Sequence, residues 1–233
     1  MERNLNNEFK KLVKEVIAPQ LRELDFKKSN TNFNRHVDGI VQLLNIQKSQ
    51  YNHSERILFT INIGFYNSEV FKISKNKTEV PKFITIDNCF VRGRTGRLIY
   101  GHDYWYELST EKSYESVLNQ VDQDLRKYIL PLFKYLETLN SIVELIKMDI
   151  EKRAYHLISS LDDIAVCELE YGDFNTGKGL LTDLFQNSII PKTTKHTIVY
   201  PDGKKEISWS EPSVNEFYIK KLKRIALRYN LVL

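Results

Sequence analysis

Three short segments carry polar side chains at every second position, in a pattern that could bind an anion or an acidic peptide. Alternation along a strand puts such residues on one face of a sheet. Arginine offers forked donors, and amides offer both a donor and an acceptor. The pairs are Asn45 and Gln47, Thr60 and Asn62, and Arg92 and Arg94, and the patch is extended by Lys48, Ser49 and Arg97. We therefore predict a candidate binding patch on one sheet face.

The same alternation also arises without a ligand. An antiparallel sheet with one face in water shows apolar and polar residues in turn. A plain solvated face more often carries Lys and Glu than the Asn, Gln and Thr found in these segments. Both interpretations predict a polar sheet face, and only the first predicts a ligand.

The segment Gly172–Lys178 has the glycine and lysine spacing of a phosphate-binding loop. It is followed by Gly179, where nucleotide hydrolases carry the Ser or Thr that holds magnesium. We instead predict a turn between two helices at the first two residues of the segment, with Tyr171 and Phe174 packed across it. The sequence thus predicts no cofactor.

No local pattern indicates a catalytic centre or a metal site. The five histidines and two cysteines lack the spacing of metal ligands, and no nucleophile motif is present. His102 and Asp103 are adjacent, so we expect a solvated turn rather than an acid–base pair. Paired carboxylates are expected on helix surfaces or at caps: Asp122 and Asp124, Asp162 and Asp163, and Glu168 and Glu170. We predict no catalytic residue and no metal, and we favour a protein that is not an enzyme.

The last predicted helix is basic and offers an alternative function. Its cations are Lys220, Lys221, Lys223, Arg224 and Arg228. They could contact nucleic acid. In the other interpretation the helix docks on the protein through one face, formed by Tyr218, Leu222, Ile225 and Tyr229. We favour docking and keep weak nucleic-acid binding as an alternative.

Charge and composition give nucleic-acid binding no support. The 34 basic and 30 acidic residues leave a net charge of +4, and the signs are interleaved. Two cysteines far apart, Cys89 and Cys167, fit a reducing compartment. The chain has no apolar run near the ~20 residues that a membrane helix needs, and its first helix carries charges that a signal peptide would not. We expect a cytoplasmic protein without a membrane segment.

Changes in hydrophobic period along the chain predict the elements that position the patch. Residues 5–24 form an amphipathic helix with a kink at Pro19, and a hairpin turns at Asp38-Gly39. A strand over 57–64 precedes a polar loop over 67–82. Further strands are expected at 89–94, 98–100 and 104–108. Because strand follows strand without helices between them, the sheet should be antiparallel.

The rest of the chain is predicted to be mainly helical. A long helix begins after Ser113 and bends at Pro131, and another begins near Asn140. A helical hairpin over 153–187 and a β-hairpin turning at 201–203 precede the last helix. We predict an α+β protein: an antiparallel sheet packed by long helices, then a helical hairpin, a β-hairpin and a terminal helix. Its domains are 1–150 and a C-terminal extension, 151–233, packed on the first.

Six short segments follow one another in a specific order: 24–28 (LDFKK), 32–35 (NFNR), 44–49 (LNIQKS), 59–64 (FTINIG), 89–96 (CFVRGRTG) and 105–108 (WYEL). Together they resemble a bacterial family, the domain of unknown function family 4304. Asp25 stands where that family usually has Gly. Over roughly residues 8–138, the resemblance implies an N-terminal helix, an antiparallel sheet and a following helix. It implies no activity, and it adds Trp105 to the candidate binding residues.

These observations favour a noncatalytic bacterial protein that uses the polar sheet face to bind a partner protein or a small acidic ligand. An alternative of another class is an enzyme acting on an acidic or phosphorylated small molecule. Such an enzyme would need a deep pocket converging on Arg92, Arg94 and Lys48. Weak nucleic-acid binding through the basic last helix is the least favoured alternative.

Overall fold

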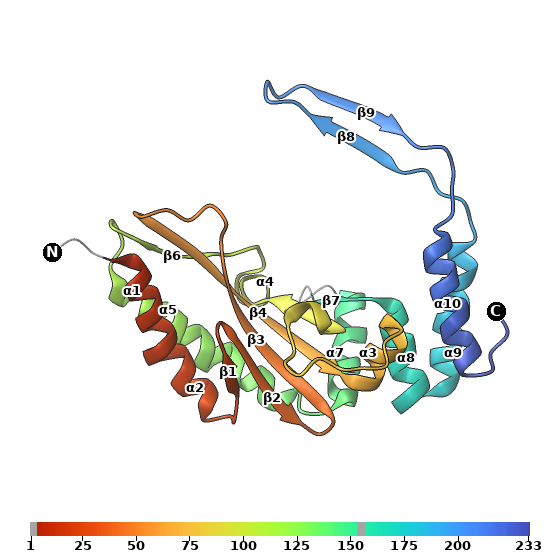
Figure 1. The fold of residues 1–233 in the computed structure, drawn as a ribbon, viewed down its shortest axis with the longest axis horizontal. Helices are drawn as coiled ribbons and strands as arrows, with labels where there is room; N and C mark the ends of the chain where they lie inside the picture. The colour runs from red at the N-terminus through yellow and green to blue at the C-terminus, as the bar shows by residue number, and fades with distance from the viewer. Residues whose placement is uncertain (1–3, 153–156) are drawn as a thin grey trace. The chain divides into compact units, whose positions relative to one another are not determined.

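The computed structural model describes residues 4–152 and 157–233, and the chain divides into two compact units, Met1–Ser160 and Leu161–Leu233. The boundary predicted from the sequence lies after residue 150. Unit 1 contains a large sheet with its helices, and unit 2 contains helices and a β-hairpin (Figure 1). The α+β class is confirmed. Residues 153–156, where the sequence predicts the start of the helical hairpin, lie outside the described residues.

The seven-stranded sheet of unit 1 pairs its strands in antiparallel fashion, as predicted. The spatial order is β1 (Lys27–Ser29), β2 (Asn32–Val37), β3 (Ile40–Lys48), β4 (Arg56–Asn67), β5 (Val91–Arg94) and β7 (Ile158–Ser159). β6 (Tyr106–Ser109) also pairs with β4. β4 is 12 residues long and pairs with β6 over residues 56–59 and with β5 over residues 62–65. β4 therefore lies beside both β5 and β6.

Two tight turns adopt left-handed backbone conformations. Asp38 and Gly39 have φ of 42° and 74°, so the β2–β3 hairpin turns at the predicted dipeptide. Asp25 has φ of 62°, although it stands where the resembled family usually has Gly. Asp tolerates this region better than most residues, because its short side chain can hydrogen-bond locally.

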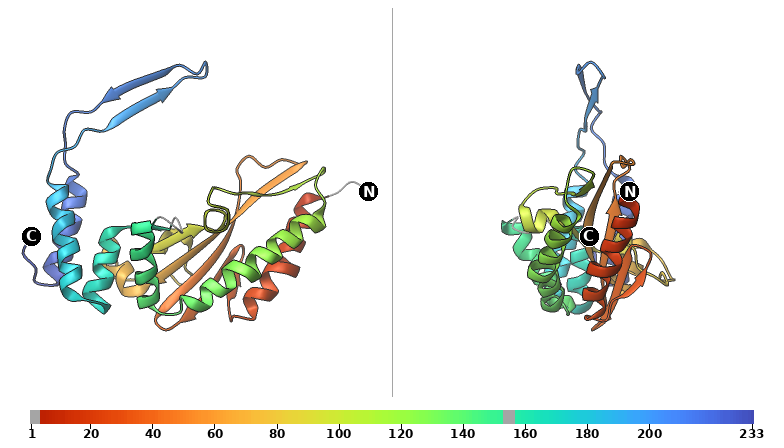
Figure 2. Two further views of the ribbon diagram at one scale, coloured as in Figure 1. Left: turned by 180° about the vertical axis from the view of Figure 1, so that it is seen from behind. Right: turned by 90° about the vertical axis from the view of Figure 1, so that its left-hand side faces the viewer.

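Two long helical segments lie side by side on one face of the sheet (Figures 1 and 2). They are α1 (Leu5–Leu12), the π-helical turn η1 (Val13–Ile17) and α2 (Ala18–Arg22), then α5 (Tyr114–Asp124), the π-helical turn η3 (Leu125–Ile129) and α6 (Leu130–Tyr135). Each π-helical turn ends just before a proline, Pro19 or Pro131. Proline donates no backbone hydrogen bond and crowds the carbonyl four residues earlier, so a wider turn accommodates it.

The opposite face of the sheet is partly covered by α3 (Ser68–Lys75) and the residues that follow it, including the short 3-10 helix η2 (Ile86–Asn88). The predicted loop over 67–82 was wrong for residues 68–75, which form α3, whereas residues 76–82 contain no helix or strand. Asn67 caps α3, because its side-chain oxygen accepts hydrogen bonds from the backbone N–H groups of Glu69 and Val70 at 3.0 Å. Val70 and Ile73 are buried, so burial of an apolar face stabilises this short helix.

The predicted strand at 98–100 was also wrong, since these residues belong to α4 (Thr95–Tyr100). Gly96 allows close approach to Tyr104, whose backbone nitrogen would lie 2.7 Å from a Cβ at that position. Gly101 ends the helix with φ of 75°. The side chain of Thr95 donates a hydrogen bond to the carbonyl of Ile61 at 3.0 Å, which ties the helix to β4. Tertiary contacts of this kind override the local strand signal.

Helix α7 (Leu139–Lys152) closes the described helices of unit 1, and the helical hairpin of unit 2 consists of α8 (Leu161–Tyr171) and α9 (Phe174–Ser188). Its turn lies at Gly172-Asp173 as predicted, and Asp173 caps α9 by accepting from the N–H of Thr176 at 2.7 Å. Tyr171 and Phe174, which were predicted to pack across the turn, are 49% and 44% exposed.

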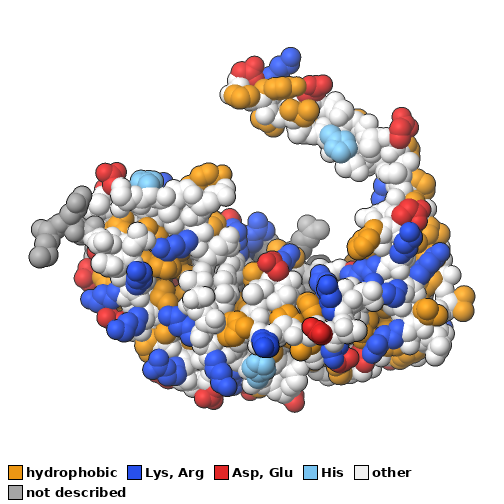
Figure 3. Space-filling model, viewed as in Figure 1, with side chains coloured by type: hydrophobic (Ala, Val, Ile, Leu, Met, Phe, Trp, Pro, Cys, Tyr) orange, Lys and Arg blue, Asp and Glu red, His pale blue; other side chains and the backbone are white. Residues whose placement is uncertain are grey.

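The second predicted β-hairpin is confirmed as β8 (Lys195–Val199) and β9 (Lys205–Trp209), and α10 (Glu216–Arg228) follows it. Both strands are exposed along their whole length, and apolar side chains appear along the hairpin in Figure 3. The backbone of Lys192 pairs with that of Ser213 and closes the base of the hairpin.

Candidate binding groove

The strand register places six of the predicted binding residues on the sheet face away from α1 and α5. Asn45 pairs with Asn62, which pairs in turn with Arg94. Gln47 pairs with Thr60, and Arg92 pairs with Gly64. Residues paired across antiparallel strands point to the same face. The amides and guanidiniums of three strands therefore lie close together.

A network of side-chain amides crosses β2, β3 and β4. Nδ2 of Asn62 donates to Oδ1 of Asn45 at 2.9 Å and to Oε1 of Gln47 at 3.1 Å. Nδ2 of Asn45 donates to Oδ1 of Asn32 at 2.9 Å. Asn62 is buried and Gln47 is exposed, so the network runs from the sheet to the solvent. Asn32 was not predicted, although its pairing with Asn45 continues the same row of amides.

Thr60 faces the same side but is closed to a ligand. It has no exposed surface, and its hydroxyl donates to the carbonyl of Tyr104 at 3.2 Å. Its role is to hold the segment before β6 against β4.

Arg94, Asp103 and Trp105 form one compact group at the edge of the patch. Nη1 of Arg94 lies 2.7 Å from both carboxylate oxygens of Asp103, and its guanidinium lies 5.0 Å from the ring centre of Trp105. The Trp105 indole N–H also donates to Asp103, at 3.3 Å. The hydrogen bond from Arg94 lowers the pKa of Asp103, and the charge of exposed Arg97 adds to this effect. Sequence analysis missed Asp103 as a member of the site.

The other guanidiniums of this face also meet carboxylates. Arg92 lies 3.4 Å from Asp87, and Arg56 lies 2.9 Å from Glu107. The pKa of Glu107 is lowered, mainly by its hydrogen bond with Lys112. The guanidiniums of Arg56, Arg92 and Arg94 are therefore each balanced by an acidic partner. None of these acidic residues was predicted, because each comes from a loop, from the short helix η2 or from a strand whose register the sequence does not fix.

Lys48 and Ser49 also line a hollow beside the patch, and each makes contacts that the sequence did not predict. The Lys48 ammonium lies 3.0 Å from Oδ1 of Asn6 and 4.3 Å from the ring centre of Phe9, both in the N-terminal helical segment. Lys48 therefore turns to the helical face, since strand alternation continues through it. The backbone N–H of Ser49 donates to the carbonyl of Leu58, and its hydroxyl accepts from the N–H of Tyr51. Ser49 thus shapes the turn after β3.

The patch lies along two adjoining hollows, which we call the polar groove. The first has a volume of about 660 Å³ and is lined by Gln47, Ser49, Tyr51, Arg56, Trp105 and Glu107 among others. The second has about 210 Å³ and is lined by Gln47, Asn62, Asp87, Arg92 and Arg94 among others. Because Gln47 lines both hollows, they form one continuous polar surface.

Several carboxylates expected on helix surfaces are buried instead. Asp124 is 6% exposed, and one of its oxygens accepts from the hydroxyls of Tyr100 and Tyr106 at 2.6 Å each. Burial and this carboxylate raise the pKa of Tyr100 to about 12. Asp162 and Glu168 of α8 are also buried. The partners of Asp124 and Asp162 lie far away in sequence, so helical periodicity could not reveal them, whereas Glu168 accepts from the nearby backbone N–H of Asp173 at 2.9 Å.

Within unit 2, the cations of α10 largely serve the fold. Lys221 forms an ion pair with Asp162, and Arg228 lies 3.6 Å from Glu170. The Lys223 ammonium lies 5.6 Å from the ring centre of Phe185. These contacts favour the docked helix over a free basic surface.

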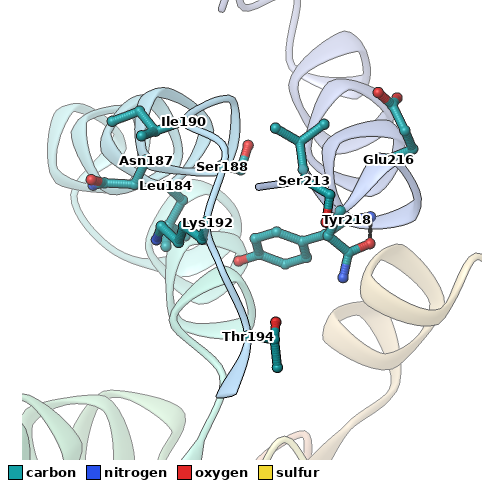
Figure 4. Close-up of a pocket in the computed structure, with 11 residues that line it drawn as sticks. Leu184, Asn187, Ser188, Ile190, Lys192, Thr194, Ser213, Glu216 and Tyr218 are labelled. Carbon is teal, nitrogen blue, oxygen red and sulfur yellow. Dashed lines mark hydrogen bonds between the residues drawn. The ribbon is translucent and has the colours of Figure 1, made fainter. Parts of the chain in front are cut away.

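A separate cavity of about 610 Å³ lies between the end of α9 and the start of α10 (Figure 4). The Tyr218 ring lies across it, and the hydroxyl donates to Asp162 at 3.4 Å. Burial and Asp162 raise the pKa of Tyr218 to about 12, so this phenol stays protonated near neutral pH. None of the predicted site residues lines this cavity.

The described residues offer neither a metal site nor a membrane-spanning helix. Residues 4–152 and 157–233 contain no group of three His, Cys, Asp or Glu side chains placed to hold a metal ion. In the same residues, no helix combines the length and apolar character required to span a bilayer.

Comparison with known families identifies the first unit. Residues 17–135, half of the chain, match the sequence model of the Domain of unknown function (DUF4304). The chain belongs to this family. No curated protein and no solved structure matches it. The matched part includes the polar groove from β2 to β6, so the groove is built mainly from the DUF4304 region, and unit 2 lies outside it.

Proposed function

We propose that this DUF4304 protein is a noncatalytic binding protein of the bacterial cytoplasm that holds a segment of a partner protein in the polar groove. The observation that carries the proposal is the combination of open amides with guanidiniums that already face carboxylates. The bacterial source rests on the sequence resemblance. The cytoplasmic location is supported by two free thiols, Cys89 and Cys167, whose pKa values are raised by burial.

Charge balance favours a peptide over a phosphate. A phosphate site needs cationic donors that no carboxylate occupies. In the groove, Arg56, Arg92 and Arg94 each lie beside an acidic side chain. Gln47 and Asn45 keep amide donors and acceptors that suit the N–H and C=O groups of a peptide backbone. The groove therefore suits a ligand with both kinds of group.

Aromatic surface adds a means of holding side chains of the partner. Tyr51 is 78% exposed, and Trp105 lies in the same hollow. Tyr, Trp and Arg are enriched in protein interfaces because they offer large contact areas with few rotatable bonds. The first hollow combines all three residue types.

Intrinsic fluorescence provides a direct test. The chain has two tryptophans, so Trp209→Phe leaves Trp105 as the reporter in the groove. A displayed library of random peptides would be selected against the intact protein, and the enriched peptides titrated while Trp105 emission is recorded. We expect saturable binding that Gln47→Ala/Arg94→Ala weakens at least tenfold.

The matched control is Gln123→Ala/Arg22→Ala, which removes the same two residue types from exposed positions on the helical layer. It should bind like the parent protein. Equal binding by the groove variant, or selection of no peptide, would contradict the proposal. Displacement of bound peptide by inorganic phosphate would instead favour the small acidic ligand, and displacement by DNA that weakens with salt would favour nucleic acid.

A further inference from the structure

The β8–β9 hairpin of unit 2 is an isolated pair of strands with apolar side chains in the solvent. Every residue of both strands is exposed, and within the described residues each strand pairs only with the other. Ile198, Val199, Ile207 and Trp209 are 53%, 60%, 53% and 64% exposed. A two-stranded hairpin is at best marginally stable in water, and clustered exposed apolar side chains mark interaction surfaces. The hairpin therefore has the properties of an interaction element.

Hydrogen bonds at both ends of β9 show which of its backbone groups point away from β8. The C=O of Lys204 and the N–H of Ser210 each make a backbone hydrogen bond across the hairpin at 2.9 Å. Backbone groups along an antiparallel strand alternate between its two sides, so every second residue from Lys204 to Ser210 faces β8. The N–H and C=O groups of Lys205, Ile207 and Trp209 consequently point outward, at the free edge of the hairpin.

These outward groups are arranged symmetrically about Ile207, which allows β9 to pair with β9 of a second copy. In an antiparallel register with Ile207 opposite Ile207, Lys205 of each copy lies opposite Trp209 of the other. All of these are hydrogen-bonded pairs, so every outward N–H and C=O group of β9 gains a partner. The product is a sheet in the order β8–β9–β9–β8. Its four strands meet the three or more that an independently stable sheet needs.

The side chains that meet in this register are electrostatically complementary. Paired residues point to the same face of a sheet, so Lys205 of one copy lies beside the Trp209 indole of the other. The hairpin already has this kind of contact within one chain, because Nζ of Lys195 lies 6.0 Å from the ring centre of Trp209, its register partner. Glu206 lies opposite Ser208 of the second copy. No two like charges are directly opposite, which favours a second copy as the occupant of this edge.

The other edge of the hairpin is less suited to self-pairing. By the same alternation, the outward residues of β8 are Lys195, Thr197 and Val199. Pairing about Thr197 would place Lys195 opposite Val199, without an aromatic ring for the ammonium and without an apolar pair at the centre. The observations therefore select the β9 edge.

We propose that two copies of this chain associate through their β9 strands, in an antiparallel register centred on Ile207, and form a continuous four-stranded sheet. This inference does not depend on the proposed partner binding, because the hairpin belongs to unit 2 and lines neither hollow of the polar groove.

Sedimentation equilibrium of the full chain, without any peptide, measures the association directly. We expect a concentration-dependent dimer. Ile207→Pro removes an outward N–H and should weaken dimerisation at least about tenfold. Thr197→Pro is the matched control, because Thr197 pairs with Ile207 across the hairpin and its N–H points out of the opposite edge. It restricts the hairpin backbone in the same way, leaves the β9 edge intact and should dimerise like the parent protein.

Cross-linking tests the register. The Cα atoms of a hydrogen-bonded pair lie about 5.5 Å apart, within the range that a disulfide spans. Mild oxidation should therefore give a covalent dimer of Ile207→Cys. Thr197→Cys should give none, because Thr197 and its counterpart are three strands apart in the proposed sheet. The parent protein, oxidised in parallel, shows the background from Cys89 and Cys167.

A monomer at all concentrations up to about 1 mM would overturn the proposal. Equal weakening by Ile207→Pro and Thr197→Pro, or equal cross-linking of the two cysteine variants, would also overturn it. So would a monomer whose Trp209 emission, recorded in Trp105→Phe protein, shifts to the blue on vesicles containing phosphatidylglycerol. That result would identify an anionic membrane as the occupant of the hairpin.

Discussion

Nη1 of Arg94 lies 2.7 Å from both carboxylate oxygens of Asp103, so a strand residue and a loop residue share one hydrogen-bonded pair. This relationship links β5 to the segment between α4 and β6. It also neutralises the most central guanidinium of the polar groove. The proposed preference for a peptide rests on this neutralisation, and it can be tested by titration.

The first prediction concerns the carboxyl group of Asp103. The hydrogen bond from Arg94 lowers its pKa below the ordinary value of 3.8. A lowered pKa stabilises the fold above pH 3.8, and this contribution is lost as the pH falls through the folded value. Arg94→Gln should therefore move the midpoint of Asp103 upward, which carbon NMR of the carboxyl group would measure.

Arg126→Gln is the control for this prediction. Arg126 contacts Asp122 on α5, where Nε lies 3.0 Å from Oδ1. Its removal should leave the Asp103 midpoint unchanged. An unchanged midpoint in Arg94→Gln would mean that the ion pair does not persist in solution.

The second prediction concerns Asn62 at the centre of the amide network. Asn62→Ala removes the donor to Asn45 and Gln47, and we expect it to lower the free energy of unfolding by about 1–2 kcal/mol. Gln47→Ala removes an exposed acceptor and should cost less than about 0.5 kcal/mol. Urea unfolding measures both values. Equal losses would show that the buried amide contributes no more than the exposed one.

The sequence was sufficient to predict which face of the sheet carries the amides. Strand alternation is local, so Asn45 and Gln47, Thr60 and Asn62, and Arg92 and Arg94 could each be assigned to one face of their own strand, and the register then aligned the three pairs. The acidic partners Asp87 and Asp103 could not be predicted. They lie in segments whose position depends on tertiary contacts, and no periodicity marks them.

The two short helices escaped prediction for a related reason. α3 and α4 have 8 and 6 residues, too few to show a helical period clearly. Their signals are local caps, Asn67 before α3 and Gly101 after α4. Asn67 also fits the start of a loop, because asparagine is common both at helix caps and in turns. A helix cap and a turn have similar local sequence signals here, and only the tertiary fold distinguishes them.

The third prediction concerns the buried carboxylate of Asp124. Burial is the main cause that raises the pKa of Tyr100 to about 12, and the hydrogen bond to Asp124 raises it further. The hydrogen bond from Gln120 acts in the opposite direction. Asp124→Asn should lower the Tyr100 midpoint and Gln120→Ala should raise it. Tyrosine ring-carbon NMR can resolve one residue among 13 tyrosines.

The raised pKa of Tyr100 also predicts how stability depends on alkaline pH. A phenol with a pKa of about 12 in the fold and 10.0 when unperturbed stabilises the fold fully below pH 10. This contribution is lost as the pH rises toward 12. Urea unfolding should show a smaller alkaline loss in Tyr100→Phe than in the parent protein. An identical alkaline loss of stability in both proteins would mean that groups other than Tyr100 cause it.

The last prediction compares two glycines of the segment that resembles a phosphate-binding loop. A Cβ at Gly177 would lie 2.8 Å from the backbone nitrogen of Leu169 and 2.9 Å from the carbonyl oxygen of Ala165, so α9 packs closely on α8 at this position. A Cβ at Gly179 would meet nothing within 4 Å. Gly177→Ala should therefore lower the free energy of unfolding by about 1–3 kcal/mol through overpacking.

Gly179→Ala should instead raise the free energy of unfolding by about 0.5–1 kcal/mol, because alanine favours a helix over glycine. Thermal unfolding of the two variants shows whether each substitution stabilises or destabilises the fold. Opposite signs are what a packed helical hairpin requires, since both glycines lie within α9. A phosphate-binding loop would keep Gly179 free for backbone contacts, and in that case both substitutions would weaken magnesium-dependent binding of a fluorescent ATP analogue. Such binding in the parent protein would contradict the assignment of this segment to a helix-to-helix turn.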